Sequence, residues 1–267
     1  MTTIQQHYSA PDMGNRVVRA LEMAGLDSSP LDWQVLAPLD QFHVRGLAAT
    51  REMAALLSPS ADDAVLDVGS GLGGPARFLA ATYGCSVVGL DLSEPFVEVA
   101  RMLTERTGFG ERVSFVQGDA LDLPFEDARF DCVWTQHTAM NIADRATLYA
   151  QMHRVLKPGG RLAAYDFVAG QGEVMFPVPW ARTPQTSFLL SADAMRQALE
   201  QAGFSPEVWH DKTDESLAGM ASIGAPAPSP LNLGVVMGDD FGKVAANLAP
   251  NLKEGRVRLV QTIARRN

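Results

Sequence analysis

The sequence has very little cysteine and no long apolar run. Only Cys85 and Cys132 occur among 267 residues, and both lie in apolar runs that predict strands, where a small buried thiol is common. So low a count fits a reducing compartment. No run of 18 or more apolar residues is available to span a membrane. Since the first residues also lack an apolar run after a basic one, no secretory signal is expected, and the cytoplasm is the predicted location.

Metal-ligand patterns and clustered positive charge are missing as well. The five histidines are scattered, and none belongs to an H-E-x-x-H or C-x-x-C pattern, so no metal ion is predicted. The formal net charge is -9 and the lysines and arginines form no cluster, which argues against a nucleic-acid partner. The predicted partner is therefore a small molecule, and a membrane partner is not expected. The sequence leaves the oligomeric state open, with a homodimer among the options.

Short apolar runs alternate with amphipathic segments along most of the chain. The composition, with 46% hydrophobic and 20% charged residues, is that of a globular protein able to bury a core. The apolar runs predict strands at 63–69, 86–92, 113–119, 130–136, 160–167, 206–211 and 256–264. Helical spacing predicts helices at 12–25, 44–57, 75–84, 94–108, 191–203 and 239–252. This alternation predicts an α/β fold with a doubly wound, mostly parallel seven-stranded sheet, whose ligand lies beyond the carboxyl ends of the strands.

A glycine-rich turn follows the first predicted strand. In "VLDVGSGLGG", Gly69, Gly71 and Gly74 match the G-x-G-x-x-G pattern that cradles the pyrophosphate of a nicotinamide or flavin cofactor. Glycines let the backbone of such a turn approach a ligand closely. Asp67, two residues before the first glycine, is unexpected beside a phosphate. A turn or helix-capping role is an equally good interpretation of that residue alone.

An acidic residue ends each of the first three predicted strands. Asp67, Asp91 and Asp119 would lie around one crevice, where they would repel a pyrophosphate and attract a cation. S-adenosylmethionine carries a sulfonium and an ammonium group and has no phosphate. Asp91 is placed to reach a ribose diol, although nicotinamide proteins place an acid similarly, and Asp119 is placed to reach the adenine amine. Taken together, the three acids favour S-adenosylmethionine over a dinucleotide.

Four motifs resemble those of the class I S-adenosylmethionine-dependent methyltransferases. They are "VLDVGSGLGG", "VVGLDLS", "VSFVQGDALDLPFEDARFDCVW" and "RVLKPGGRLAAYDF", and they cover residues 65–167 in the family's order. The resemblance implies a Rossmann-like methyltransferase fold, S-adenosylmethionine as cofactor and S-adenosylhomocysteine as product. It also implies a set of cofactor-binding residues, namely Asp67, Gly69, Ser70, Gly71, Asp91, Leu92, Asp119, Ala120 and Gln136.

A second resemblance lies before this core. The stretch "DQFHVRGLAATREMAALL", residues 40–57, is similar to the corresponding part of glycine, sarcosine and dimethylglycine N-methyltransferases and of sugar or ubiquinone-type methyltransferases. This implies that Tyr8, His43, Arg45 and Gly46 fold over the methionine end of the cofactor, with Arg45 near its carboxylate. It also implies that His43 lies beside the substrate. Alternatively, the stretch is a packing helix with His43 and Arg45 on its solvent side.

We expect one methyltransferase domain with four parts. They are an N-terminal helical cap at 1–60, an S-adenosylmethionine-binding core at 61–168, a substrate lid region at 169–240 and a C-terminal helix and strand at 241–267. Residues 216–238 contain no charged side chain, and Pro226, Pro228 and Pro230 interrupt regular structure. A long loop is therefore predicted there, and such loops are often lids.

The stretch after the fourth predicted strand carries the predicted catalytic residues. "VWTQHTAMNI" places Gln136, His137, Met140 and Asn141 at the mouth of the crevice. Methyl transfer needs a positioned acceptor and exclusion of water, and a hydroxyl or ammonium acceptor must also lose a proton. His137 is the predicted general base because histidine titrates near neutral pH, and Asn141 is the second predicted catalytic residue. A packed or orienting histidine is the alternative.

The predicted function is transfer of a methyl group from S-adenosylmethionine to an oxygen or nitrogen of a small, partly apolar molecule. Phe176 and Trp180 in "MFPVPWARTP" predict an apolar roof over this substrate, and Met140 is expected to contact it. Three alternatives are C-methylation of a quinone or phenol precursor, a nicotinamide-dependent oxidoreductase and a non-catalytic S-adenosylmethionine-binding module. The sequence does not identify the acceptor.

Overall fold

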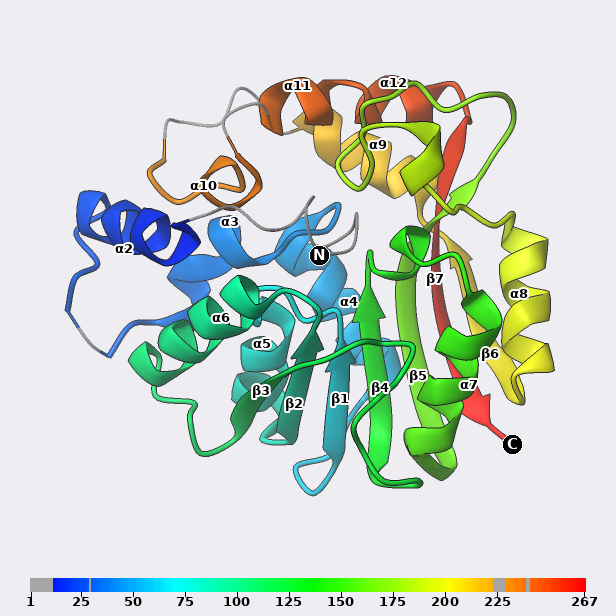
Figure 1. Cartoon of the computed structure of the whole chain (residues 1–267), viewed down its shortest axis with the longest axis horizontal. Helices are drawn as coiled ribbons and strands as arrows, with labels where there is room; N and C mark the ends of the chain where they lie inside the picture. The colour runs from blue at the N-terminus through cyan, green and yellow to red at the C-terminus, as the bar shows by residue number, and fades with distance from the viewer. Residues whose placement is uncertain (1–11, 29, 223–228, 239–240) are drawn as a thin grey trace.

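The fold is built on a single sheet flanked by helices (Figure 1). A computed structural model describes residues 12–267 except 29, 223–228 and 239–240. Within these residues the sheet has seven strands in the order β3-β2-β1-β4-β5-β7-β6. Their bounds are Ala64–Val68 (β1), Ser86–Asp91 (β2), Val113–Gln117 (β3), Phe130–Gln136 (β4), Leu156–Ala169 (β5), Phe204–Asp211 (β6) and Val257–Arg266 (β7). The predicted doubly wound seven-stranded sheet is confirmed.

The strand order reverses between β1 and β4, and a crevice is expected at the carboxyl ends of these two paired strands. β1 pairs in parallel with β2 through Val65–Val87 and with β4 through Val65–Cys132. The chain first winds outward through β2 and β3 and then returns to β4 and β5 on the other side of β1. This reversal is the topological switch point at which α/β sheets bind ligands. Only β7 is antiparallel to its neighbours β5 and β6 in the described sheet.

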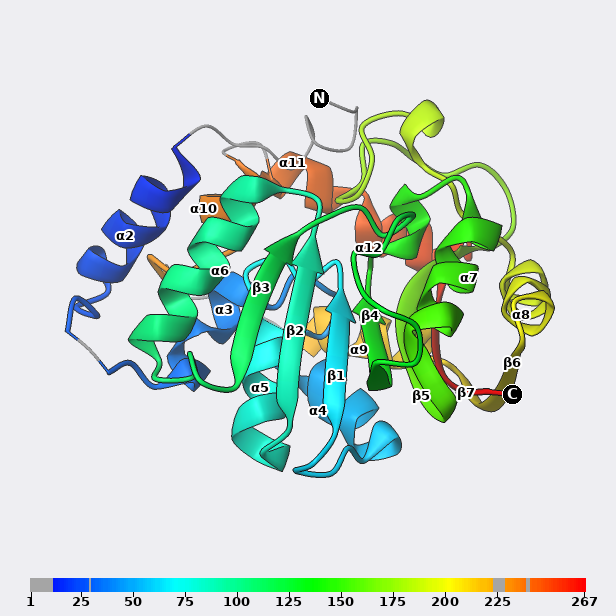
Figure 2. The same cartoon turned by 60° about the horizontal axis from the view of Figure 1, so that its bottom comes forward.

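Helices cover both faces of the sheet because buried strands need apolar cover on each side. α4 (Gly46–Leu57), α5 (Gly74–Tyr83) and α6 (Glu94–Arg106) pack on one face, which Val65 and Trp134 share. α7 (Arg145–Val155) and α8 (Ala192–Gln201) pack on the other face, with Leu66 and Val133. Figure 2 shows α4 and α5 behind the strands. The alternation of Val65 and Leu66 between the two cores follows from the two-residue period of a strand.

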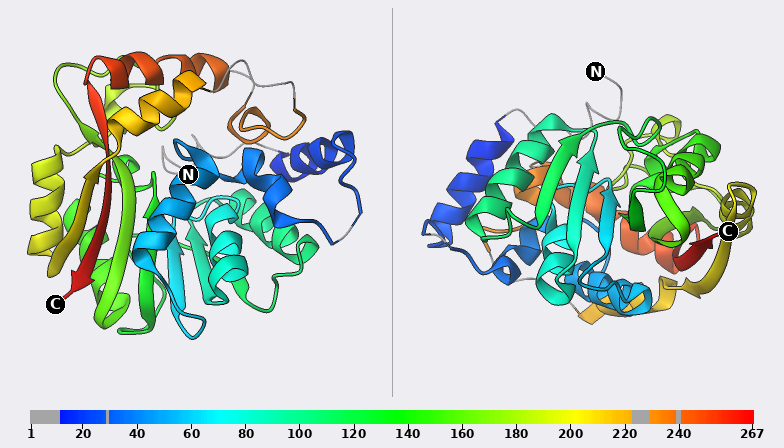
Figure 3. Two further views of the ribbon diagram at one scale, coloured as in Figure 1. Left: turned by 180° about the vertical axis from the view of Figure 1, so that it is seen from behind. Right: turned by 90° about the horizontal axis from the view of Figure 1, so that it is seen from below.

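A further group of helices lies over the carboxyl ends of the parallel strands. It comprises α9 (Thr213–Ser222), α10 (Gly234–Met237), α11 (Phe241–Ala246) and α12 (Leu248–Lys253), and the views from the front and from behind agree on its position (Figures 1 and 3). The N-terminal elements α2 (Met13–Met23), η1 (Trp33–Leu36) and α3 (Ala37–Asp40) lie beside α5 and α6. Two short 3-10 helices, Ala139–Asn141 (η2) and Pro184–Thr186 (η3), follow β4 and β5 respectively. No described helix is both long and apolar enough to cross a bilayer.

The C-terminal third differs from the sequence predictions in two places. The predicted long loop at 216–238 is wrong at its start, because α9 continues to Ser222 and packs Leu217 and Met220 against the core. Pro226 and Pro228 lie outside the described residues. The predicted single helix at 239–252 is two helices, since Pro250 has no N–H and fits only the first turn of a new helix that begins at Leu248.

Candidate active site

A cavity of about 1030 Å³ opens at the carboxyl ends of β1 to β4 and beneath α9 to α12. One side, the strand-end wall, is formed by lining residues within 69–71, 90–93 and 118–121, which follow the first three strands. The opposite side, the helical wall, is formed by Met220, Leu233, Met237, Phe241, Ala245 and Leu248. The cavity therefore sits at the switch point of the sheet, where the sequence placed the ligand.

The glycine turn uses its own N–H groups within the protein. Gly69 and Ser70 donate to the carbonyl oxygen of Leu90 at 2.8 and 3.1 Å. Gly71 donates to Oδ2 of Asp91 at 2.8 Å. A phosphate-binding turn instead directs such N–H groups at the ligand. At these three positions the turn offers no donor to a pyrophosphate and presents a carboxylate beside it.

The three predicted acids lie in different environments. Asp91 and Asp119 line the cavity, and Asp91 also accepts the N–H of Ser93 at 2.9 Å. Asp67 is buried at the end of β1, away from the cavity wall, and its Oδ2 has no hydrogen-bond partner. Burial and the nearby Asp91 carboxylate raise the pKa of Asp67 to about 8. Burial raises the pKa of Asp91 too, but the N–H groups of Ser93 and Gly71 oppose that rise, and Asp67 has no such donors at its Oδ2.

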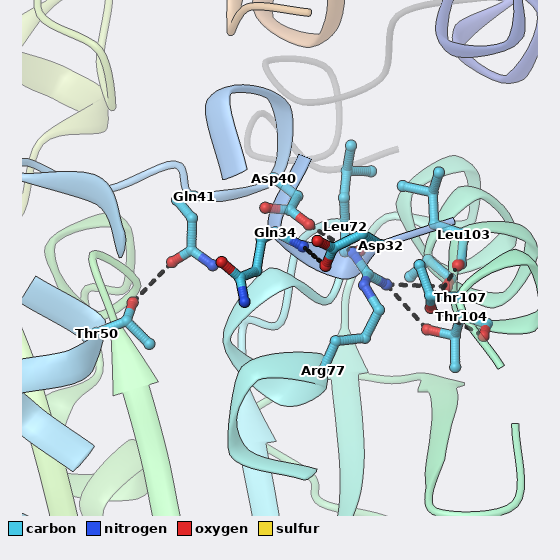
Figure 4. Close-up of polar contacts among 11 residues, drawn as sticks. Asp32, Gln34, Asp40, Gln41, Thr50, Leu72, Arg77, Leu103, Thr104 and Thr107 are labelled. Carbon is cyan, nitrogen blue, oxygen red and sulfur yellow. Dashed lines mark hydrogen bonds and ion pairs between the residues drawn. The ribbon is translucent and has the colours of Figure 1, made fainter. Parts of the chain in front are cut away.

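A buried ion pair holds the glycine turn from behind (Figure 4). The Arg77 guanidinium is fully buried and donates to Asp40 Oδ2 at 2.8 Å, to the Leu72 carbonyl at 2.7 Å and to Thr104 Oγ1 at 2.9 Å. It thus ties α5 and its preceding turn to α3 and α6. Burial raises the pKa of Asp40 although Arg77 opposes that rise. Removing either partner would leave an unpaired charge in the interior.

Gln136 presents a fixed amide at the end of β4. Its Oε1 accepts the indole N–H of Trp134 at 3.1 Å, and because an indole nitrogen only donates, this contact fixes which amide atom is oxygen. The side chain is buried and lines the cavity, and its Nε2 has no partner. A buried donor without a partner costs about 1–3 kcal/mol. A ligand acceptor in the cavity would remove that cost.

His43 is held in one tautomer. Its Nε2 lies 3.0 Å from the carbonyl oxygen of Gly46, which only accepts, so Nε2 carries the proton. The same nitrogen lies 2.9 Å from Thr50 Oγ1, and Thr50 donates in turn to Gln41 at 2.7 Å. Burial lowers the pKa of His43 to about 4. The imidazole is therefore neutral at physiological pH.

His137 lies in an aromatic cluster on the cavity wall. Its ring is 5.1 Å from the ring of Tyr165 and 4.5 Å from that of Phe167, and the edge-on His43 ring is 6.0 Å away, all between centroids. Nε2 of His137 has no partner. Burial and the neighbouring His43 hold the pKa of His137 well below its usual value. The near-neutral pKa expected from the residue type is therefore wrong for this environment.

Arg45 lines the cavity but its guanidinium is already paired. It donates to Glu52 Oε2 at 2.7 Å within the same helical segment, and Glu52 also pairs with Lys212 at the start of α9. Arg45 itself has a left-handed backbone, with φ of 68°, which turns the chain into α4. To bind a cofactor carboxylate, the Arg45 guanidinium would have to bind it together with Glu52 or break the ion pair with Glu52.

The structure brings together most of the residues that the sequence singled out. Those on the cavity wall are His43, Arg45, Gly46, Gly69, Gly71, Asp91, Leu92, Asp119, Ala120, Gln136, His137, Met140, Asn141 and Trp180. Asp67 and Ser70 are buried outside the wall, and the Oγ of Ser70 has no partner. Phe176 packs against the hydrophobic core and not on the cavity. Tyr8 lies outside the described residues.

Sequence reasoning missed Asp166, which positions the stretch after β4. Asp166 is buried in β5, accepts the N–H of Ala139 at 2.7 Å and accepts that of Phe167 at 2.9 Å. Burial raises its pKa to about 6. By holding Ala139, it fixes the turn that carries His137 and Asn141. The available signal was a carboxylate inside an otherwise apolar strand, which requires hydrogen-bond partners.

Comparison with known proteins fits this geometry. Residues 66–164 match the sequence profile of a family described as "Methyltransferase domain". Over these residues the chain is similar to a methyltransferase domain. The resemblance predicted from the four sequence motifs is thereby confirmed, and the match covers the strand-end wall and the turn after β4.

Individual relatives agree with the family. The chain is 36% identical to methyltransferase GfsG of Streptomyces halstedii over 59% of this chain and 56% of that one. It is 37% identical to O-methyltransferase cnsE of Penicillium expansum over 64% of this chain and 63% of that one. The matches thus span less than two thirds of these curated relatives. Geranyl diphosphate C-methyltransferase from Streptomyces coelicolor shares the fold, with a TM-score of 0.70, 18% identity and coverage of 100% and 99%.

Proposed function

We propose that the protein transfers a methyl group from S-adenosylmethionine to an oxygen or nitrogen of a small, partly apolar molecule. The observation that carries this proposal is the glycine turn, whose Gly71 N–H is bound by the Asp91 carboxylate. That pairing removes a phosphate donor and adds a negative charge, which disfavours a dinucleotide and suits a cationic nucleoside. The similarity to a methyltransferase domain over residues 66–164 supports the same activity.

The residues of the cavity fit S-adenosylmethionine, which supplies an electrophilic methyl group when bound. Asp91 would accept the ribose hydroxyls and Asp119 the adenine amine, because carboxylates are strong acceptors. Gln136 Nε2 lacks a partner and would donate to the methionine end. The remaining proposed contacts are Tyr8, Arg45 and Gly46 at the methionine end, Leu92 and Ala120 beside the adenosine, and Gly69 and Gly71 in the turn, which the buried Asp67 and Ser70 support from behind.

The catalytic task left to the chain is to position the acceptor, exclude water and take a proton. His137 is neutral, and its Nε2 has no partner, so it is the proposed proton acceptor for a hydroxyl group, whereas a neutral amine acceptor needs none. His43 lies beside it and Asn141 shares the wall, where we propose that they orient the acceptor. The low pKa keeps the His137 base unprotonated, although it also makes that base weak.

Titration calorimetry with three ligands tests the cofactor. We expect S-adenosylmethionine and S-adenosylhomocysteine to bind and NADH not to bind. Incubation with methyl-labelled S-adenosylmethionine and a metabolite extract should then label one class of small molecule. Binding of NADH in place of S-adenosylmethionine would overturn the proposal, and cofactor binding with no labelled product would favour a non-catalytic module. A small-molecule substrate and a cytoplasmic location belong to the same proposal.

A further inference from the structure

The six side chains that define the helical wall are apolar, and the hydroxyl of Ser216, which also lines the cavity from α9, donates to the Lys212 carbonyl oxygen at 2.6 Å. These six side chains come from α9, from the residue before α10 and from α10, α11 and α12, all of which lie over the strand ends (Figure 1). None of these side chains carries a hydrogen-bonding group or a charge. Phe167 and Phe188 extend the same apolar surface toward the turn after β4. Apolar groups of a ligand on this side of the cavity are therefore stabilised by burial, whereas a charged group there would be buried without a partner.

The charged side chains of the cavity are few and are already engaged. In the described part of the chain they are Arg45, Asp91, Asp119 and Asp144. Arg45 is paired with Glu52 at 2.7 Å. Asp144 caps α7 and accepts the Thr147 N–H at 2.9 Å and the Thr147 hydroxyl at 2.7 Å. Asp91 and Asp119 belong to the strand-end wall, so the acceptor side has no cation to spare for a phosphate or a carboxylate.

The sequence closes this inventory for basic side chains; the charged residues outside the described part are the acids Asp239 and Asp240. The stretches outside the description are 1–11, 29, 223–228 and 239–240, and they contain no lysine and no arginine. Recognition of phosphate or carboxylate in proteins typically uses Arg or Lys side chains. Those stretches therefore cannot add such a side chain to the acceptor side.

His137, Phe167 and Trp180 do not form a cage for a cationic acceptor. Phe167 is stacked on Trp180 with 4.3 Å between ring centroids, and it lies 4.5 Å from His137. A cation-binding cage needs open ring faces, whereas these rings cover one another. The Trp180 indole N–H is also used, since it donates to Ser187 Oγ at 2.9 Å. The cluster therefore adds apolar surface and not a charge-recognition site.

We infer that the methyl acceptor is an uncharged, largely apolar and bulky molecule, and that phosphorylated and zwitterionic acceptors are rejected. The cavity of about 1030 Å³ is at the upper end of the range for ligand pockets, about 300–1,000 Å³, so it holds a bulky acceptor beside a nucleoside. In naming this ligand a methyl acceptor, the inference rests on the proposed function. The size and polarity of the ligand follow from the cavity itself.

A binding experiment with the uncharged dye Nile red tests the inference. In the presence of S-adenosylhomocysteine, we expect the full-length protein to bind Nile red with increased fluorescence. Oestradiol, an uncharged and bulky phenol, should displace the dye. Sarcosine, phosphoethanolamine and geranyl diphosphate should not displace it at the same concentrations. Equal displacement by the charged compounds, or no dye binding, would overturn the inference.

Two matched variants test whether the dye binds in the cavity. Met220→Asp puts a charge on the helical wall and should weaken Nile red binding about tenfold or more. Met23→Asp makes the same change at a methionine of α2 that is 78% exposed, and it should leave dye binding unchanged. Unchanged S-adenosylhomocysteine affinity in Met220→Asp shows that the variant is folded. Equal dye binding by the two variants would contradict the inference.

A failure of the proposed function gives a different experimental result from a failure of this inference. It would show as absence of S-adenosylhomocysteine binding to the wild-type protein in calorimetry. Dye binding without added nucleoside, together with its loss in Met220→Asp, would then still support an apolar ligand. Conversely, nucleoside binding with no dye binding removes the inferred acceptor class and leaves methyl transfer standing.

Discussion

The two sides of the cavity are built in different ways. The strand-end wall consists of short turns whose polar groups are tied to the next strand, as in the Gly71–Asp91 contact of 2.8 Å. The helical wall consists of apolar side chains from four separate helices near the end of the chain. Directional hydrogen bonds fix the first wall, whereas the cavity surface of the second is made of apolar side chains. We therefore expect substitutions on the two walls to separate cofactor binding from acceptor binding.

The largest expected effect concerns His137, where the two walls meet. His137→Gln should lower turnover of a hydroxyl acceptor by about 10²–10⁴ and leave S-adenosylhomocysteine affinity unchanged, because it removes a proton acceptor and not a cofactor contact. His153→Gln, on α7 outside the cavity, is the control and should keep full turnover. The measurement is kcat with an acceptor identified by label transfer.

The pH profile sharpens the same test. Because the pKa of His137 is held well below its usual value, wild-type turnover should not fall between pH 8 and pH 6 through protonation of this group. If turnover in His137→Gln were unchanged, or fell only as much as in His153→Gln, His137 would be a packing residue and not the proton acceptor.

The next largest effect concerns the support behind the strand-end wall. Arg77→Met should lower the free energy of unfolding by about 3–5 kcal/mol, because the Asp40 carboxylate would stay buried without its partner (Figure 4). Chemical denaturation measures this change. Lys157→Met breaks the exposed pair with Asp131 and should cost about 0–1 kcal/mol. Similar costs for the two variants would show that the buried pair does not hold the turn.

Asp91 tests the strand-end wall directly. Asp91→Asn keeps the size of the side chain but replaces one carboxylate oxygen by an NH2 group and removes an acceptor, and it should weaken S-adenosylmethionine binding by about tenfold to a hundredfold. Calorimetry gives this affinity, and Nile red binding should not change. Asp122→Asn, at an exposed carboxylate that does not line the cavity, should bind as the wild type does. If Asp91→Asn weakened only the dye, the assignment of the two walls would be reversed.

The smallest effect comes from the titration of Asp67. Its pKa is raised to about 8 in the folded protein from 3.8, so folding favours the protonated form. The contribution of Asp67 to the free energy of unfolding is complete below pH 3.8, the pKa of this group in the unfolded chain, and is lost as the pH rises through 8. From pH 6 to pH 9 we therefore expect Asp67→Asn to gain about 5 °C in Tm relative to the wild type. Thermal melts at both pH values measure the gain, and Asp122→Asn should show none.

Local patterns were enough to predict the strand-end side of the molecule. The strands β1 to β5, the helices α5 and α6, the glycine turn and the acids Asp91 and Asp119 follow from short-range spacing along the chain. The helical wall was not predictable in this way. Residues 216–238 were expected to be a loop, and the side chains of α9 and α12 meet only through the path of the chain.

Individual residues show the same division. The sequence placed His137 at the mouth of the cavity but not in the aromatic cluster that lowers its pKa, since Tyr165 and Phe167 come from another strand. It offered Phe176 as part of a roof, whereas packing turned this side chain to the core and left Trp180 on the cavity. Asp166 was missed because its partners, the N–H groups of Ala139 and Phe167, become visible only in the folded chain.

The sequence by itself determined the sheet, the position of the crevice and the acidic character of its strand-end wall. These follow from residue periodicity and from the fixed geometry of a strand-to-helix turn. Tertiary structure alone decided that the glycine turn has already used its N–H groups, that the two histidines are neutral and that the acceptor side carries no spare charge. The physical reason is that burial and hydrogen bonding depend on neighbours from distant parts of the chain, and a local pattern does not specify them.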